Sequence, residues 1–260
     1  MNPSTELQLR ENEVKSSKYL VTPFRCLYRA TGFVGAALGV GTSKPKGLNS
    51  RSKALTKAKY LNEKTRLILQ INGTKTIVTG ELPRKPCMVV SNHLGYLDPV
   101  ILTALIPSAP IAKSEVRKWP LVGRAAEEAG VLFVNRESAH SGATVLRQAI
   151  RTVKEGSSVL VFPEGTTTSG EQVLPFKRGI FGAAKIAGCE IVPVAIKFAD
   201  VKNCWIGDDP FLPHYMRLIS QPEQVVHVHV CHPMRPSGCA QTDSRNARNI
   251  VLEALHKLPS

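Results

Sequence analysis

The order of apolar and polar residues predicts secondary structure along most of the chain. Short runs rich in Val and Ile are typical of strands, whereas apolar residues that recur every three or four positions are typical of helices with one buried face. The runs predict strands at 75–79, 87–90, 110–113, 131–134, 158–162, 190–198 and 225–231. The longer periodicity predicts helices at 100–105, 120–129, 138–155 and 177–187, and a C-terminal helix that includes 247–255.

This alternation of strands and helices predicts the fold class and the division of the chain. Strands followed in turn by helices favour an α/β fold with a largely parallel or mixed sheet flanked by helices. A chain of 260 residues can form one such domain with an N-terminal appendage. We therefore expect a flexible tail at 1–18, a helical segment at 19–70 and the main domain at 71–260.

The N-terminal segment combines apolar and basic residues. Residues 19–40 are largely apolar and carry Arg25 and Arg29 at helical spacing, and residues 44–66 contain eight basic residues and one acidic residue. This composition fits an interfacial membrane helix, and it fits equally a helical hairpin packed on the domain with solvated lysines. The best candidate for a transmembrane segment, at 30–43, has only 14 residues, whereas a spanning helix needs about 20.

The net charge of +14 favours partners that carry phosphate, such as nucleic acids, anionic lipids or phosphorylated small molecules. Nucleic acid is the less favoured partner, because no recognition motif is present and only 6% of the residues are aromatic. The six cysteines include no close Cys-x-x-Cys pair, which predicts reduced thiols in a cytosolic environment. His227, His229 and Cys231 invite a metal interpretation, but their alternation with valines favours a partly exposed strand without metal.

Candidate chemistry lies where the apolar run 87–90 ends. A loop with His93 near its start leads to Asp98, Pro99 and the apolar residues 100–105, an order that is typical of an N-cap, a first helical position and a helix. A carboxylate beside an imidazole orients it to remove a proton from a hydroxyl group. Taken alone, the pair favours a simpler interpretation, in which Asp98 caps the helix and the histidine is solvated.

Several later stretches change that interpretation, because they occur with the His-x4-Asp element in a recognisable order. Together they resemble the four sequence blocks of the glycerolipid acyltransferase family, which includes 1-acylglycerol-3-phosphate and other lysophospholipid acyltransferases. The resemblance covers residues 87–197. Besides the His93 loop, the stretches are Gly130–Arg136, Phe162–Thr168, Leu174–Gly179 and Ile191–Val194.

The resemblance implies a reaction and a role for each matching residue. An acyl group would pass from acyl-CoA or acyl-carrier protein to the hydroxyl of a lysophospholipid, with His93 as general base and Asp98 orienting it. No cofactor or metal is implied. No Ser or Cys lies in a nucleophile-elbow setting, so we expect direct transfer. The substrate-binding residues implied are the basic residues Lys113, Arg136 and Lys177 and the acceptor-binding residues Glu164, Gly165 and Thr166.

The resemblance also implies membrane lipids as substrates. It therefore favours the membrane-interfacial interpretation of residues 19–70, and we expect a membrane-associated protein on the cytoplasmic face; the oligomeric state stays open. The expected product is phosphatidic acid, formed from 1-acyl-glycerol-3-phosphate. One departure weakens that choice: Thr167 stands where bacterial lysophosphatidate enzymes usually have arginine. Lysophosphatidylethanolamine, lysophosphatidylcholine and lyso-ornithine lipid are the alternative acceptors.

Overall fold

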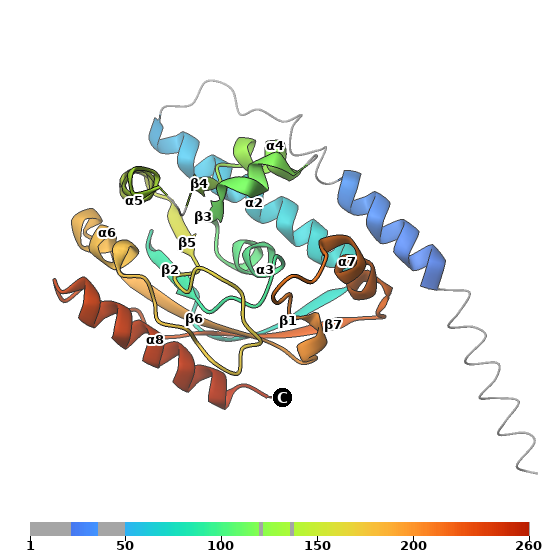
Figure 1. Cartoon of the computed structure of the whole chain (residues 1–260). Coiled ribbons are helices and arrows are strands. Elements are labelled where there is room, and N and C mark those ends of the chain that lie inside the picture. The colour runs from blue at the N-terminus through green and yellow to red at the C-terminus, as the bar shows by residue number, and fades with distance from the viewer. Residues whose placement is uncertain (1–21, 36–49, 120–121, 136–137, 260) are drawn as a thin grey trace, which may run out of the picture.

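The computed structural model describes residues 22–35, 50–119, 122–135 and 138–259. Within them, a sheet of seven strands has the order β1-β7-β6-β2-β5-β3-β4 (Figure 1). The strands are β1 (Thr74–Gly80), β2 (Met88–Ser91), β3 (Ser108–Lys113), β4 (Leu132–Val134), β5 (Ser158–Val161), β6 (Ile191–Phe198) and β7 (Gln224–Val230).

The sheet is mixed. Strands β6, β2, β5, β3 and β4 are parallel to one another. Strand β7 pairs antiparallel with β6, and β1 pairs parallel with β7. The predicted fold class, an α/β fold with a largely parallel or mixed sheet, is confirmed. The parallel strands bring their carboxyl ends to one edge, which is where sites form in such folds.

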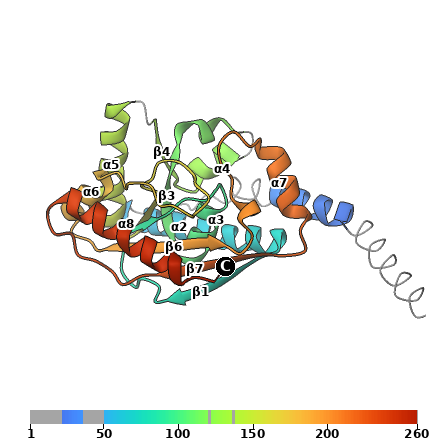
Figure 2. The same cartoon turned by 60° about the horizontal axis from the view of Figure 1, so that its bottom comes forward.

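Helices cover both faces of the sheet, and each face has its own apolar core (Figures 1 and 2). Side chains alternate between the cores along β2: Val89 points into one, and Met88 and Val90 into the other. The longer helices are α2 (Ser50–Asn72), α3 (Asp98–Leu105), α4 (Val122–Glu128), α5 (Ala139–Lys154), α6 (Gly179–Ala187), α7 (Phe211–Ser220) and α8 (Ala240–Lys257). Two short 3-10 helices are η1 (Ser114–Lys118) and η2 (Val201–Asn203).

Local signals place several helix ends where the sequence predicts them. Ser138 is the N-cap of α5 and its side chain accepts a hydrogen bond from the Ser141 amide. Gly188 ends α6 with φ of 69°, a left-handed conformation that glycine adopts without a Cβ clash. Helix α7 was not predicted. Its signal is the apolar spacing of Phe211, Tyr215, Leu218 and Ile219, which Pro213 within the first turn does not interrupt.

Residues 22–35 form a helix that packs on the core beside α7. The Arg29 side chain is buried, and its guanidinium donates to the carbonyls of Ile219, Gln221 and Pro222 at the C-terminal end of α7. A cation there satisfies carbonyls that lack helical partners and complements the negative end of the helix dipole. Arg29 therefore faces the protein and not a lipid surface.

Helix α2 also contacts the domain directly. The Asn62 side-chain amide donates to the carbonyls of Thr103 and Ala104 near the end of α3, and Arg66 Nε donates to Ala104. The predicted tail at 1–18 lies outside the described residues. Among those described, no helix is both long and apolar enough to cross a bilayer.

Candidate active site

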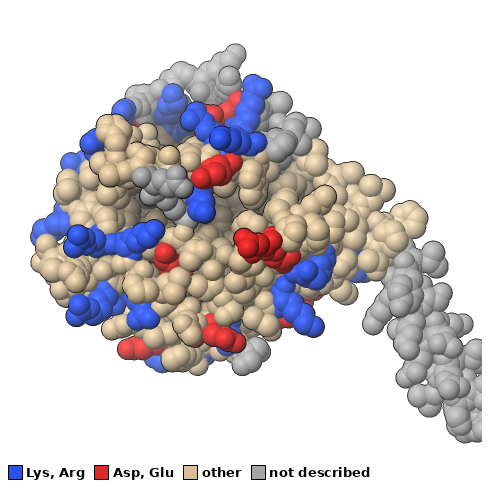
Figure 3. All heavy atoms as spheres, viewed as in Figure 1, with Lys and Arg blue, Asp and Glu red and all other residues tan. Residues whose placement is uncertain are grey.

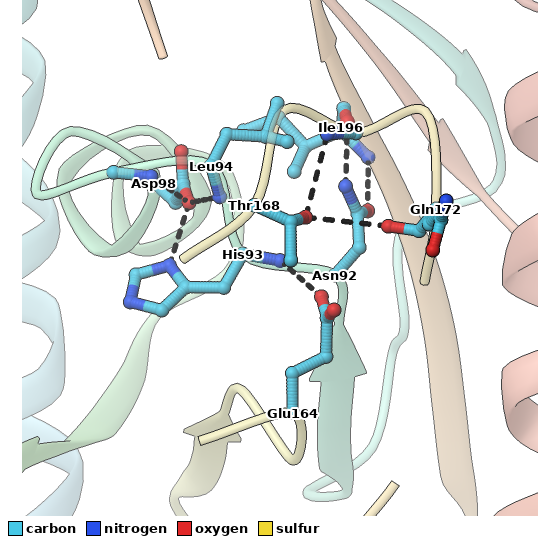
Figure 4. A network of polar contacts seen from close by, with 10 residues as sticks. Asn92, His93, Leu94, Asp98, Glu164, Thr168, Gln172 and Ile196 are labelled. Atoms are coloured by element: carbon cyan, nitrogen blue, oxygen red, sulfur yellow. Dashed lines mark hydrogen bonds and ion pairs between the residues drawn. The ribbon is translucent and has the colours of Figure 1, made fainter. Parts of the chain in front are cut away.

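The loop that carries His93 starts at the end of β2, in the middle of the sheet, and its first residues are fixed by a neighbouring strand. The Asn92 side chain donates to the Ile196 carbonyl and accepts from the Ile196 amide, both at 2.9 Å (Figure 4). Asn92 is fully buried, so this paired hydrogen bond is shielded from water. It fixes the backbone immediately before the histidine to β6.

His93 and Asp98 form a hydrogen-bonded pair, with 2.7 Å between His93 Nδ1 and Asp98 Oδ2. Asp98 is fully buried, and the same oxygen accepts from the amides of Leu94 and Gly95. Because an ionised carboxylate only accepts, Nδ1 carries the proton and the lone pair of Nε2 is left to act as a base. The predicted N-cap role of Asp98 is wrong: the N-cap of α3 is Leu97, and the carboxylate turns back into the loop.

The His93 ring is also held from the side. It stacks on Phe162 with 4.2 Å between ring centroids and 18° between the ring planes. Phe162 follows β5, which pairs directly with β2. The side chain of His93 is 17% exposed, so the ring is held but still reachable. A general base needs both properties.

Glu164 lies next to this loop, and both of its carboxylate oxygens accept from backbone amides. Oε1 accepts from the His93 amide (Figure 4) and Oε2 from the Leu174 amide, each at 2.8 Å. Burial raises the pKa of this carboxyl, and the two hydrogen bonds oppose that rise. Glu164 therefore joins the loop at 162–176 to the catalytic loop, and its substrate-binding role stays a prediction. On the same side, the Thr168 amide donates to the His93 carbonyl at 2.8 Å.

A cavity of about 820 Å³ lies beside the His93 ring, within the range of roughly 300–1,000 Å³ that is usual for ligand pockets. It brings together five residues that the sequence predicted for the site: His93, Lys113, Gly165, Thr166 and Lys177. In Figure 3 a hollow lies near the centre of the face, bordered by both basic and acidic side chains. Most of the cavity wall is apolar and comes from several helices, as with Phe33, Leu61, Val100, Leu146 and Ile180.

Lys113 and Lys177 supply positive charge to this cavity. Lys113 ends β3, and Lys177 precedes α6. Lys177 Nζ is 2.6 Å from where a Cβ on Gly165 would lie, so a side chain at position 165 would displace the ammonium group from its present place. Within the described residues, neither ammonium has a hydrogen-bond or ion-pair partner. Both are available to an anion.

Two other candidates from the sequence, the phosphate-binding Arg136 and the possible metal ligands on β7, are not part of the described cavity. Arg136 lies outside the described residues, so the structure says nothing of its predicted phosphate contact. On β7, His229 Nδ1 lies 2.8 Å from Thr79 Oγ1 on β1, and the described residues contain no group of three side chains that could hold a metal.

Three residues that hold the His93 loop were not predicted from the sequence. The first is Asn92, for which an amide beside the motif histidine is the available signal. Tyr96 lies inside the loop, and His214 lies on α7, which was not predicted. Their contact joins residues 118 positions apart, and no local pattern signals it.

Comparisons with known proteins show which family the chain belongs to. A family model described as Acyltransferase matches residues 53–197. The lyso-ornithine lipid O-acyltransferase of Pseudomonas aeruginosa is 38% identical over 184 residues, which are 68% of this chain and 71% of that protein. The 1-acyl-sn-glycerol-3-phosphate acyltransferase of Neisseria gonorrhoeae is 37% identical over 113 residues, 44% of each chain. The chain therefore belongs to the acyltransferase family, and it is an acyltransferase of glycerolipid or lysophospholipid type.

The fold is also known from a solved structure. The crystal structure of PlsC, the 1-acyl-sn-glycerophosphate acyltransferase of Thermotoga maritima, superposes with a TM-score of 0.66 at 21% identity. The match covers 92% of this chain and 97% of PlsC. The likeness at this identity establishes the architecture, and the substrate has to be argued from the site of this chain.

Proposed function

We propose that this protein transfers a fatty acyl group from a thioester, acyl-CoA or acyl-carrier protein, to the free hydroxyl of a lysolipid whose headgroup contains a carboxylate or a phosphate. The observation that carries the proposal is that the cavity is lined by His93, by three lysines that include Lys113 and Lys177, and by a mostly apolar wall. A lysolipid presents a hydroxyl, an anion and an alkyl chain, and each of these features finds a matching surface in the cavity.

In the proposed reaction His93 Nε2 takes the proton of the acceptor hydroxyl while the hydroxyl oxygen attacks the thioester carbonyl. The tetrahedral intermediate then expels the thiolate, so a C–O bond forms and a C–S bond breaks. The imidazolium returns the proton to the leaving thiolate, which departs as a thiol. Asp98 stabilises the imidazolium, because its buried carboxylate lies 2.7 Å from Nδ1.

The first acceptor that we propose is lyso-ornithine lipid. Thr167 lines the cavity where a lysophosphatidate enzyme usually has arginine, which leaves less positive charge for a phosphate monoester. An ornithine headgroup carries one carboxylate and one ammonium, so it needs fewer cations. The relatives named lyso-ornithine lipid O-acyltransferases from Pseudomonas aeruginosa and Brucella abortus are covered over 71% and 74% of their lengths.

The second acceptor is 1-acyl-glycerol-3-phosphate, the one that the sequence interpretation favoured. The ammonium groups of Lys113 and Lys177, which have no partner among the residues that the structure describes, support it, since a phosphate monoester carries close to two negative charges. Two relatives that bear this name, from two Neisseria species, are matched over 44% of their lengths.

We further propose that the protein lies on the membrane through the helix at 22–35 and α7. Phe24, Leu27 and Tyr28 on the first helix and Leu212 on α7 are 63–74% exposed. Hydrogen bonds from Arg25 and Arg29 to carbonyls at the end of α7 hold the two helices together. Phe33 of the same helix lines the cavity, so a lipid leaving the bilayer would meet the site there.

The test of the reaction is thiol release by purified protein, measured with acyl-CoA and with acyl-carrier protein as donors. Lyso-ornithine lipid and 1-acyl-glycerol-3-phosphate are compared as acceptors at equal concentrations. We expect acceptor-dependent release that is about 10²- to 10⁴-fold slower in His93→Ala, because that is the usual loss when a general base is removed. Release that does not depend on an acceptor, or that survives in His93→Ala, would refute the proposed mechanism.

The test of membrane binding is sedimentation with vesicles that contain anionic phospholipid. We expect Leu27→Asp and Leu212→Asp to lower the bound fraction. Ile186→Asp is the matched control, because Ile186 is 66% exposed but lies on α6. Equal binding by all of these variants would show that the bilayer is not contacted through this surface.

A further inference from the structure

Tyr96 connects the catalytic loop to helix α7. Its hydroxyl lies 2.8 Å from His214 Nδ1, and His214 is 1% exposed. On its other side, His214 Nε2 lies 3.2 Å from the Cys204 carbonyl. The imidazole of His214 thus bridges the loop between His93 and Asp98 and the segment between β6 and α7.

The direction of these hydrogen bonds follows from their partners. A carbonyl oxygen only accepts, so His214 Nε2 carries a proton and donates to Cys204. In the neutral imidazole Nδ1 is then an acceptor, and the Tyr96 hydroxyl is the donor. Burial lowers the pKa of His214 and raises that of Tyr96, and both shifts favour this neutral arrangement.

The same side of the loop has a second attachment. The Trp205 amide donates to the Leu94 carbonyl at 2.7 Å, and the Tyr96 ring makes edge contacts with Trp205 and Phe211. Glu164 and Thr168 hold the loop through the backbone of His93. The loop is therefore held by hydrogen bonds to two segments, one that follows β5 and one that follows β6. On the side of the segment that follows β6, the Tyr96 side chain makes the hydrogen bond to His214.

We propose that Tyr96 and His214 are a positioning pair for the acyl transfer, through which α7 holds the loop of His93 and Asp98 in its working geometry. This inference rests on the proposed function, because the pair affects the rate of acyl transfer only if His93 is the general base. The physical reason is the sensitivity of catalysis to distance: a displacement of about 1 Å costs as much as 10²-fold in rate. Tyr96 is three residues from His93 and two from Asp98, so releasing its hydroxyl loosens both ends of the catalytic pair.

The experiment compares two amides at position 214. In His214→Asn the side-chain oxygen takes the place of Nδ1 and still accepts from Tyr96, whereas in His214→Gln the amide takes the place of Nε2 and still donates to Cys204. Both variants remove the imidazole and both keep one buried hydrogen bond, so their losses of stability are matched. Tyr96→Phe removes only the hydroxyl and keeps the ring contacts.

We expect kcat to fall about tenfold in Tyr96→Phe and in His214→Gln, with KM for donor and acceptor nearly unchanged. The kcat of His214→Asn should stay within about threefold of that of the parent enzyme, because Asn still accepts from Tyr96 and keeps the loop in place. In a Tyr96→Phe background the two amides should become equal, since no hydroxyl is left for Asn to accept from. Melting temperatures of all variants separate this pattern from general loss of structure.

Three results would overturn the proposal, and the activity of His93→Ala separates the first two from the third. If His93→Ala is inactive while Tyr96→Phe keeps its kcat, or if Asn and Gln at 214 are equally active in the parent background, the positioning pair fails and the proposed function stands. If His93→Ala keeps its activity, the catalytic assignment fails and the pair fails with it.

Discussion

The two sides of the cavity differ in how completely their polar groups are paired. On the catalytic side, Asp98 Oδ2 accepts from His93 Nδ1 and two loop amides, and both oxygens of Glu164 accept from backbone amides. On the other side, the ammonium groups of Lys113 and Lys177 have no partner within the described part of the chain. On the first side Asp98 Oδ2 and both oxygens of Glu164 have their hydrogen-bond donors once the protein folds, although Asp98 Oδ1 has none among the described residues. The second side has positive charge to offer an incoming anion.

Under the proposed function, this difference separates proton transfer on one side of the site from substrate binding on the other. Groups that are fixed in advance stabilise a transition state without reorganising, so changes on the catalytic side should appear in kcat. Cations that bind an anion equally in the ground state and the transition state should appear in KM. Substitutions on each side test this separation, and Asp98→Asn has the largest expected effect.

Asp98→Asn should lower kcat by about 10²- to 10⁴-fold and leave KM nearly unchanged. The neutral amide cannot stabilise the imidazolium, and its NH₂ group favours the wrong tautomer of His93 if it faces Nδ1. Steady-state kinetics with the preferred acceptor measure both constants. A rise in KM with kcat intact would assign Asp98 to binding and break the proposed separation.

Lys177→Met should raise KM for the acceptor by about 10- to 100-fold, because a hydrogen bond to a charged group contributes about 1.5–3 kcal/mol. Lys113→Met should act in the same direction. Lys185→Met is the matched control, since Lys185 is an exposed lysine on α6. Equal effects of Lys177→Met and Lys185→Met would show that Lys177 contacts no substrate.

Glu164→Gln should lower the free energy of unfolding by about 1–3 kcal/mol, because the amide can accept from only one of the two backbone donors and leaves the other unpaired. Urea denaturation measures the change. If Glu164 instead contacts the acceptor, its substitution should raise KM and leave the unfolding midpoint in place. This test decides between the observed loop contact and the predicted substrate contact.

The smallest effect concerns pH. Burial lowers the pKa of His214 in the folded protein, so the unfolded chain takes up this proton first as the pH falls. The contribution to stability is present above the unfolded pKa of about 6.5 and is lost as the pH falls through the lower folded value. His214→Asn lacks this group, so its melting temperature should fall less between pH 7 and pH 5. Parallel melting curves would contradict the assignment of a neutral His214.

Much of the fold follows from local sequence. The run at 87–90, the His-x4-Asp spacing and Pro99 predicted strand, loop and helix, and β2 and α3 confirm them. Helix α5 begins after Ser138 and α6 ends at Gly188, as predicted, because caps and left-handed turns depend on neighbouring residues. The predicted N-cap at Asp98 was wrong, because that carboxylate has a stronger set of donors inside the loop.

By itself the sequence determined the strands, most helices, the family and the residue types of the site, since periodicity and short motifs act over a few residues. Only the tertiary structure decided which partners meet. Glu164 reaches the His93 amide across 71 positions, Tyr96 reaches His214 across 118, and Arg29 reaches the Ile219 carbonyl across 190. Such contacts depend on the order of strands in the sheet and on how helices pack over it, and no local pattern encodes that order.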